Sequence, residues 1–249
     1  MLNVKRLDLY LKYDRPLSAN ELDQLRPLVK RRAQHEPLQY IIGYTDFMNA
    51  RIEVSPEVLI PRIETEQLVE NILGTFPEGS QLTVLDIGTG SGCIPIALKQ
   101  ERPDWELHAL DISAEALEVA KENAAINQVE ITFHHGDIKK PEAFDFDGPF
   151  DVIVSNPPYV LPEEKETLEK QVVEYEPATA LFTKNLIHTY QSIIDYARQN
   201  LAEKGTLFFE LHDLHAGEIK KLFDYDHWDA NVEKDYEKKP RFLRASLQQ

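Results

Sequence analysis

A four-residue run, Asn156-Pro157-Pro158-Tyr159, carries residue types suited to holding a flat amide or amine group. Each proline fixes its backbone φ angle and lacks an N–H, so the segment is stiff and its carbonyls stay free as acceptors. The Asn156 side chain adds a carbonyl acceptor, and Tyr159 adds an aromatic face. We expect a planar –NH2 group to donate to the Asn156 side chain and the Pro157 carbonyl, with Tyr159 packed beside it. This pattern indicates chemistry at an amide or exocyclic nitrogen.

A glycine-rich run, residues 86–92 (Asp86-Ile87-Gly88-Thr89-Gly90-Ser91-Gly92), lies between a predicted strand and a predicted helix. Alternating glycines let the backbone pass close to a ligand, and a helix amino end offers free N–H groups. The run is no P-loop, because it lacks Gly-Lys-Ser/Thr, and Cys93 replaces the third glycine of a dinucleotide motif. Asp111 ends the next predicted strand, where a carboxylate can accept hydrogen bonds from both ribose hydroxyls. Together these features predict a nicotinamide or adenosyl cofactor site.

Alternating strands and helices from Thr65 onward must position these residues. The predicted strands are 82–86, 106–110, 131–134, 150–154 and 206–211, and two late strands at 227–233 and 241–247 are expected to form an antiparallel pair. This pattern favours an α/β fold with a mainly parallel sheet covered by helices on both faces. Ligands of such sheets lie at the carboxyl ends of the strands, where the strand order reverses. Four segments lie at or just past a predicted strand end: the run that begins at Asp86, then Asp111, Gly136-Asp137 and Asn156.

The amino-terminal region has a different, helical pattern. Ser18 with Glu21 forms a capping-box pattern before apolar residues at helical spacing, and Pro27 is expected to kink or break that helix. Residues 39–60 alternate loosely and indicate a hairpin or extended linker. We therefore expect a helical domain at 1–38, a linker at 39–64 and a catalytic domain at 65–249. Farther on, we expect a short acidic helix at 163–175 and a long helix from 186 that Gly205 stops.

Composition and charge narrow the classes of function. The chain has 249 residues and a formal net charge of −16. Residues 61–249 carry 18 Lys and Arg against 35 Asp and Glu, a net −17 that disfavours direct contact with nucleic acid. No apolar run is long enough to span a membrane. The single cysteine, Cys93, is expected to be inert and fits a reducing, cytoplasmic location.

The histidines predict no metal site. His134-His135 lacks a third ligand at a suitable spacing. His212 and His215 are interpreted as the start of a helix capped by Asp213. The run Glu163-Glu164-Lys165-Glu166 is interpreted as a solvated helix face.

The motifs together resemble a known family. Asn-Pro-Pro-Tyr after a glycine-rich adenosyl turn is similar to amino methyltransferases that use S-adenosylmethionine. The segment Pro61-Arg62-Ile63-Glu64-Thr65-Glu66 resembles the Pro-Arg-Pro-Glu-Thr-Glu of the HemK/PrmC family, the protein-(glutamine) methyltransferases of peptide-chain release factors. Residues 9–17 and 32–43 resemble that family's amino-terminal helical domain, and Glu176-Pro177 with Ala180-Leu181 resembles the stretch after its catalytic motif. The resemblance covers most of the chain.

The resemblance implies a Rossmann-like class I S-adenosylmethionine-dependent methyltransferase with a seven-stranded sheet. It implies a release factor as protein substrate, methylated on the glutamine of its Gly-Gly-Gln motif, and a helical domain that helps to dock it. We expect a monomer without metal. The implied cofactor contacts are Gly88, Thr89, Gly90, Ser91, Gly92, Asp111, Asp137, Ile138 and Asn156, and the implied substrate contacts are Asn156, Pro157, Pro158 and Tyr159, with Asn156, Pro157 and Tyr159 catalytic.

Three other interpretations share these motifs. A glutamine methyltransferase for a ribosomal protein would use the same chemistry on another target. An adenine-N6 methyltransferase for DNA or RNA would also hold a planar –NH2, but it must extrude a base and hold phosphates, which the acidic catalytic region disfavours. A catalytically silent cofactor-binding module is disfavoured by the intact Asn156–Tyr159 run.

Overall fold

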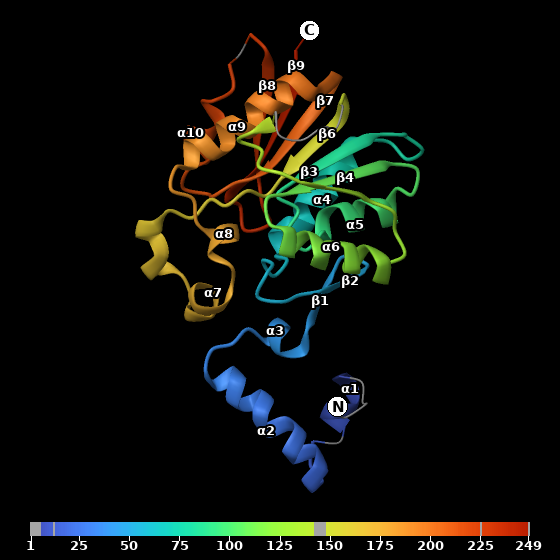
Figure 1. The fold of residues 1–249 in the computed structure, drawn as a ribbon, viewed down its shortest axis with the longest axis vertical. Coiled ribbons are helices and arrows are strands. Elements are labelled where there is room, and N and C mark those ends of the chain that lie inside the picture. Colours follow the sequence, from blue (N-terminus) through green and yellow to red (C-terminus); the bar gives the residue numbers. More distant parts are fainter. Residues whose placement is uncertain (1–5, 12, 142–147, 225, 249) are drawn as a thin grey trace.

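A seven-stranded, mostly parallel sheet forms the centre of the protein (Figure 1). The computed structural model describes residues 6–11, 13–141, 148–224 and 226–248. The strand order is β5-β4-β3-β6-β7-β9-β8, with β9 antiparallel to both β7 and β8. The strands are β3 (Thr83–Ile87), β4 (Glu106–Asp111), β5 (Thr132–His135), β6 (Phe150–Ser155), β7 (Leu201–Glu210), β8 (Trp228–Lys234) and β9 (Pro240–Leu247). The order reverses between β3 and β6, as the predicted α/β fold requires.

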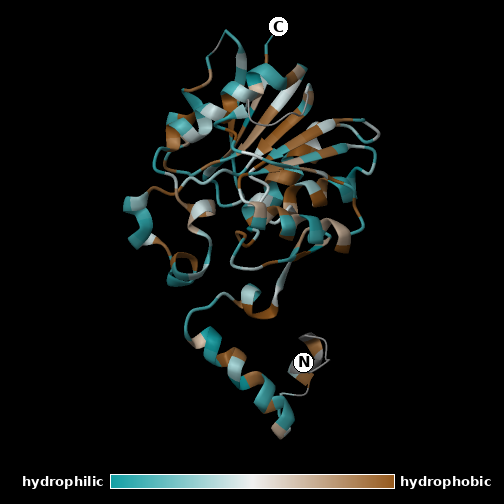
Figure 2. Ribbon diagram, viewed as in Figure 1, coloured by the Kyte–Doolittle hydropathy of each residue, from teal (hydrophilic) through white to brown (hydrophobic). Residues whose placement is uncertain are grey.

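Successive side chains of each strand point to opposite faces of the sheet, and each face has its own hydrophobic core. On one face, Val84 and Val152 pack with α4 (Ile63–Thr75), α5 (Cys93–Glu101) and α6 (Ala114–Ile126). On the other face, Leu85 and Ile153 pack with α9 (Leu186–Asn200) and α10 (Ala216–Lys220). Both faces are covered, which accounts for the continuous apolar runs of the central strands (Figure 2).

Most central strands lie where the sequence predicts them. Between β4 and β5, Ser113 caps α6, because its side chain accepts the Ala116 N–H. Two predictions about helix ends were wrong. Gly205 does not stop α9, because β7 begins directly at Leu201 and a register irregularity in its pairing with β6 accommodates Gly205 within the strand. The acidic helix expected at 163–175 is divided into a 3-10 segment, η2 (Pro162–Thr167), and α7 (Lys170–Tyr175), which α8 (Ala178–Leu181) follows.

The amino-terminal elements lie below the sheet in Figure 1. They are α1 (Arg6–Leu11), α2 (Ala19–Ala33), α3 (Leu38–Ile42) and the hairpin β1 (Tyr44–Phe47)–β2 (Ala50–Glu53). The capping box of Ser18 and Glu21 is present. Of the kink or break predicted at Pro27, the break is wrong: α2 continues through the proline, which is exposed to solvent. The short helix α3 also replaces part of the expected linker.

Buried asparagine Asn123 of α6 ties the hairpin to the glycine-rich turn. Its amide donates to the carbonyls of Glu53 and Ser91 at 2.9 and 3.0 Å, and its oxygen accepts the Glu53 N–H at 2.7 Å. All hydrogen-bonding capacity of this side chain but one lone pair is used. None of the described helices is long and apolar enough to cross a membrane.

A buried ion pair joins two segments that are distant in sequence. The Arg62 guanidinium contacts a Glu176 carboxylate oxygen at 2.5 Å, and the second oxygen accepts the Ile60 N–H at 3.2 Å. The Glu176 side chain is 1% exposed and that of Arg62 is 33% exposed. This pair fixes the start of α4 against the segment between α7 and α8.

Replacement of Arg62 by alanine should lower the free energy of unfolding by about 2 kcal/mol, because Glu176 would remain buried without its cation. Urea denaturation followed by circular dichroism measures this loss. Lys121→Ala, which removes an exposed ion pair with Glu118 on α6, should change the same quantity by less than about 0.5 kcal/mol. Equal effects of the two substitutions would contradict the structural role of Arg62.

Candidate active site

Strand register aligns the predicted site residues along the carboxyl ends of the sheet. Ile87 of β3 pairs with Leu110 of β4 and with Ser155 of β6, and Ser155 pairs with Phe209 of β7. The next residue on each strand therefore lies at the same level, and these residues are Asp111, Gly88, Asn156 and Glu210. The reversal of strand order falls in the middle of this row, which is where ligands of such sheets bind.

The glycine-rich turn has backbone angles that most residues avoid. Gly88 and Gly90 have φ angles of 76° and 54°, and a Cβ added at either residue would meet no atom within 4 Å. At Gly92 an added Cβ would lie 3.1 Å from the Ala120 Cβ. Gly88 and Gly90 therefore leave open space beside the backbone for a ligand, whereas Gly92 lets α5 approach α6.

Asp111, the last residue of β4, forms a hydrogen bond with the glycine-rich turn. One carboxylate oxygen accepts the Gly90 N–H at 2.8 Å and the other accepts the Ser113 N–H at 2.9 Å. Each oxygen keeps a lone pair for a further donor, such as a ribose hydroxyl. Burial raises the pKa of Asp111, while the backbone donors of Ser113 and Gly90 oppose that shift.

Asp137 and Ile138 follow β5 at the same end of the sheet. The Gly136 N–H donates to the Asp111 carbonyl at 3.0 Å, which brings this corner beside β4. The Asp137 carboxylate accepts the Lys139 N–H at 3.0 Å and so closes its own turn. Ile138 packs against the core on the α9 side of the sheet.

Asp86 is a fully buried carboxylate beneath the turn, and neither of its oxygens has a hydrogen-bond partner among the described residues. Burial raises its pKa to about 7. A buried carboxylate without a donor is costly unless a ligand supplies a cation or a donor. The two open glycines leave room for a ligand and Asp111 keeps acceptor capacity for its hydroxyls, while Asp86 lies buried beneath them next to the Thr89 hydroxyl.

Asn156 belongs to a chain of hydrogen bonds that is partly buried. Its amide Nδ2 donates to the Thr65 hydroxyl at 3.2 Å, and that hydroxyl donates to a Glu210 carboxylate oxygen at 2.8 Å. The Tyr159 hydroxyl lies 3.4 Å from the other Glu210 oxygen. While Glu210 is ionised its carboxylate only accepts, so Thr65 must receive from Asn156, and this fixes which way the Asn156 amide faces. Its Oδ1 has no hydrogen-bond partner among the described residues.

The prolines of the run also keep an acceptor free. Pro157 is buried and Pro158 is partly buried, and the Pro157 carbonyl accepts no hydrogen bond from the described part of the chain. The Tyr159 ring is partly buried and stands edge-on to the His212 ring, with 5.6 Å between centroids. The site therefore offers two neighbouring carbonyl acceptors on a rigid segment.

Sequence reasoning missed Glu210 as a site residue and assigned Thr65 no chemical role. Glu210 is fully buried, and burial raises its pKa to about 7, opposed by the Thr65 hydroxyl and the Arg241 guanidinium. The available signal was an acidic residue near the end of an apolar predicted strand, Leu207 to Leu211. Such a residue is rarely buried without a function.

The structure agrees with the interpretation of Cys93 as inert, but it does not agree with the helix cap expected near His212 and His215. Burial raises the pKa of Cys93 to about 12, in line with an inert thiol. His134 stacks on His108 at 5.3 Å. The interpretation of Asp213 as a helix cap was wrong, because α10 begins after His215 and no side chain caps it.

Comparison with known proteins places the chain in a family. The methyltransferase small domain matches residues 63–181, and the PrmC N-terminal domain matches residues 1–43. The release factor glutamine methyltransferase of Bacteroides thetaiotaomicron is 38% identical over 253 residues, covering 99% of this chain and 88% of that protein. The namesake of Chlorobaculum tepidum is 39% identical, covering all of this chain and 87% of that protein. This chain belongs to the release factor glutamine methyltransferase family.

Solved structures agree on the fold of this family member. A methyltransferase from Pyrococcus furiosus superposes with a TM-score of 0.58 at 17% identity, covering 91% of this chain and 98% of that one. A ribosomal protein L11 methylase from Lactobacillus delbrueckii superposes with a TM-score of 0.55 at 23% identity, covering 80% and 84%. At these identities the likeness concerns the fold, which confirms the predicted class I methyltransferase sheet.

Proposed function

We propose that this protein transfers the methyl group of S-adenosylmethionine to the side-chain amide nitrogen of the glutamine in the Gly-Gly-Gln motif of a release factor. The observation that carries the proposal is the fixed orientation of Asn156. Its Oδ1 is left free beside the Pro157 carbonyl and next to the glycine-rich turn. The names of the relatives supply the protein substrate.

The residues around the turn fit S-adenosylmethionine. Open space at Gly88 and Gly90 accommodates a ligand against the backbone, and Asp111 retains acceptor capacity for ribose hydroxyls. Thr89, Ser91, Asp137 and Ile138 complete the proposed cofactor contacts. When bound, the cofactor supplies an electrophilic methyl group on a sulfonium.

The substrate amide must be oriented before its nitrogen can react. An amide nitrogen is a poor nucleophile because its lone pair is delocalised into the carbonyl. Asn156 Oδ1 and the Pro157 carbonyl would accept its two N–H bonds and hold the nitrogen at attack distance. As the nitrogen becomes positive, these fixed acceptors stabilise it without reorganising. Tyr159 and Pro158 would pack against the amide plane.

Loss of the proton needs no strong base. The nitrogen becomes acidic as the methyl bond forms, so its proton can pass to water or to a backbone acceptor. The site accordingly relies on orientation and on dipoles that are already in place.

We further propose that the amino-terminal helices contact the protein substrate. None of the described side chains of α2 is buried, and Val29 is 64% exposed. Arg32 donates to the Gln171 side chain at 3.1 Å, and the Tyr175 hydroxyl donates to the Gln34 carbonyl at 2.7 Å. These bonds connect the end of α2 to α7, which follows the Asn156–Tyr159 run. We expect residues 1–38 to act as a docking domain and the enzyme to act as a monomer in the cytoplasm.

Labelled methyl transfer to a purified release factor tests the proposal. We expect label on the wild-type release factor and none on a variant whose Gly-Gly-Gln glutamine is replaced. A ribosomal protein mixture, DNA and RNA serve as controls. Label on nucleic acid alone would overturn the proposal in favour of a nucleic-acid methyltransferase, which the net −17 of residues 61–249 disfavours.

The ionisation of Glu210 should control turnover. When Glu210 is protonated it can donate to Thr65, the hydroxyl can then turn toward Asn156, and the orientation of the amide is lost. At saturating cofactor, kcat should therefore fall as pH decreases through about 7, the pKa that burial gives Glu210. Glu210→Gln should have a lower kcat without this inflection. An unchanged pH profile in that variant would contradict the assignment.

A further inference from the structure

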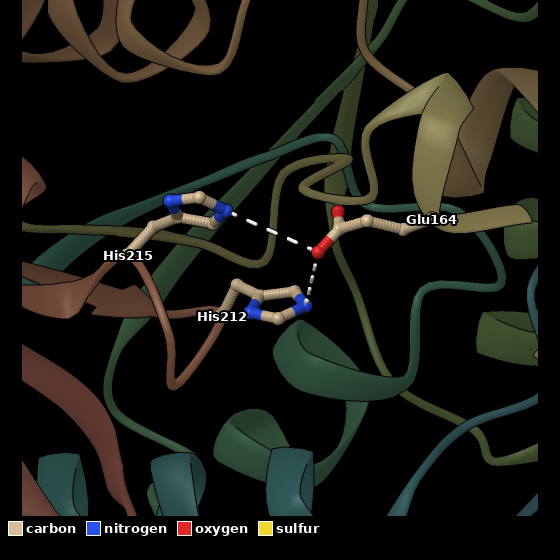
Figure 3. Close-up of side chains that lie close together, drawn as sticks. All are labelled: Glu164, His212 and His215. Atoms are coloured by element: carbon tan, nitrogen blue, oxygen red, sulfur yellow. Dashed lines mark ion pairs between the residues drawn. The ribbon is translucent and has the colours of Figure 1, made fainter. Parts of the chain in front are cut away.

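A second cluster of side chains lies beside the catalytic run. Glu164 of η2 converges with His212 and His215, which precede α10 (Figure 3). A Glu164 oxygen, Oε1, is 3.5 Å from His212 Nε2 and 4.0 Å from His215 Nε2. All three atoms lie within 4.8 Å of one another, and the side chains are 18–21% exposed. Two imidazoles and one carboxylate at this spacing are a donor set that zinc prefers.

In each of the three side chains, the oxygen or nitrogen that faces away from the cluster contacts another polar group. The second oxygen of Glu164 accepts the Leu161 N–H at 2.7 Å, which directs Oε1 toward the histidines. His212 Nδ1 is 3.4 Å from an Asp213 oxygen, and His215 Nδ1 is 3.4 Å from a Glu218 oxygen. A carboxylate behind the far nitrogen is the arrangement that orients metal-binding histidines and fixes their tautomer.

The local charges favour a cation over a simple histidine–glutamate ion pair. Oε1 of Glu164 faces the Nε2 atom of both rings, which leaves each Nε2 directed toward the same point as the carboxylate oxygen. Three carboxylates, on Glu164, Asp213 and Glu218, have an oxygen within 3.5 Å of a nitrogen of one of the two rings. The Leu214 N–H donates to His212 Nδ1 at 3.2 Å without metal. Because Leu214 is 76% exposed, that N–H can be released to water when Nδ1 becomes a donor to Asp213.

We propose that Glu164, His212 and His215 form a binding site for a divalent zinc-class cation, with these three side chains as ligands and one position open to water. The ion would join η2, which follows the Asn156–Tyr159 run, to the segment between β7 and α10. His212 packs on Tyr159, so the bound ion would fix the two segments that flank the tyrosine. Its role is structural and separate from the methyl transfer.

Zinc binding to the full-length protein tests the site without cofactor or substrate. Protein stripped with a chelator is titrated with Zn²⁺ by calorimetry, and bound metal is counted after dialysis. We expect one equivalent per chain for the wild type. Glu164→Gln and His215→Gln should each weaken binding at least tenfold, and Asp213→Asn by about tenfold, the usual effect of removing a partner behind a ligand. Circular dichroism of metal-free variants verifies folding.

His227→Gln is the matched control, because His227 forms an exposed pair with Asp224 away from the cluster. This variant should bind zinc like the wild type, and Co²⁺ should give visible absorption bands in both but not in His215→Gln. Absence of stoichiometric binding by the wild type, or equal affinity of the wild type and Glu164→Gln, would overturn the proposal. Neither result bears on methyl transfer, which is measured separately.

Discussion

Asn156→Ala is expected to reduce kcat for methyl transfer by roughly 30- to 1000-fold, which corresponds to about 2–4 kcal/mol of transition-state stabilisation. The substitution removes the side-chain acceptor that the Thr65 hydroxyl orients. The amide nitrogen of the substrate glutamine then loses part of its alignment and part of the stabilisation of its developing positive charge. Single-turnover methyl transfer with a saturating release factor measures the chemical step directly.

Cofactor affinity distinguishes a loss of substrate orientation by Asn156 from a disruption of the whole active site. The contacts proposed for S-adenosylmethionine lie mainly on the glycine-rich turn and Asp111, so its dissociation constant should change by less than about threefold in Asn156→Ala. Asn231→Ala, on the outer strand β8, should leave both quantities unchanged. Near-wild-type turnover in Asn156→Ala would remove the proposed role.

Thr65→Val should lower kcat by about 10- to 100-fold while preserving side-chain shape. Valine has no hydroxyl, so Asn156 Nδ2 loses its acceptor and one Glu210 oxygen loses its donor. The Asn156 amide is then free to rotate by 180° about its terminal torsion. The Michaelis constant for cofactor should change little, which distinguishes orientation from binding.

A double-mutant cycle shows whether Thr65 acts through Asn156. In an Asn156→Ala background, Thr65→Val should cost at most about threefold, because the oriented group is already absent. Thr206→Val is the matched control: this buried hydroxyl bonds to Ser246 at 3.1 Å between β7 and β9 and should leave kcat unchanged. Additive effects of Thr65→Val and Asn156→Ala would contradict the coupling.

The sheet could be predicted because its signals are local. Apolar runs bounded by Pro, Gly or Asp mark β3, β4 and β6, and the alternation with helices leaves few topologies. Once the strands are known to be parallel, their carboxyl ends must meet, which brings Asp111, the glycine-rich turn and Asn156 into one row. The row itself is therefore a consequence of strand polarity.

The rest of the site depends on contacts that no local pattern encodes. Thr65 and Glu210 are separated by 145 positions, and their hydrogen bond forms only because α4 packs on β7. The helix α2 continues through Pro27, which faces solvent, so water can bind the carbonyl that the missing proline N–H leaves unpaired. Gly205 was interpreted as a helix stop, although it lies inside β7, where an added Cβ would be 3.0 Å from the Ala202 carbonyl oxygen and the Leu201 side chain.

The Asn123 side chain also limits how parts of relatives can be exchanged. Its amide group forms hydrogen bonds with Glu53 of the hairpin and with Ser91 of the turn. One side chain therefore holds both segments in place. A chimera that imports a foreign amino terminus should therefore be spliced between α3 and β1, ahead of the anchored hairpin. A junction placed after the hairpin would replace the backbone to which the recipient's Asn123 must bond. It would thereby weaken the support of the turn that we propose to bind the methyl donor.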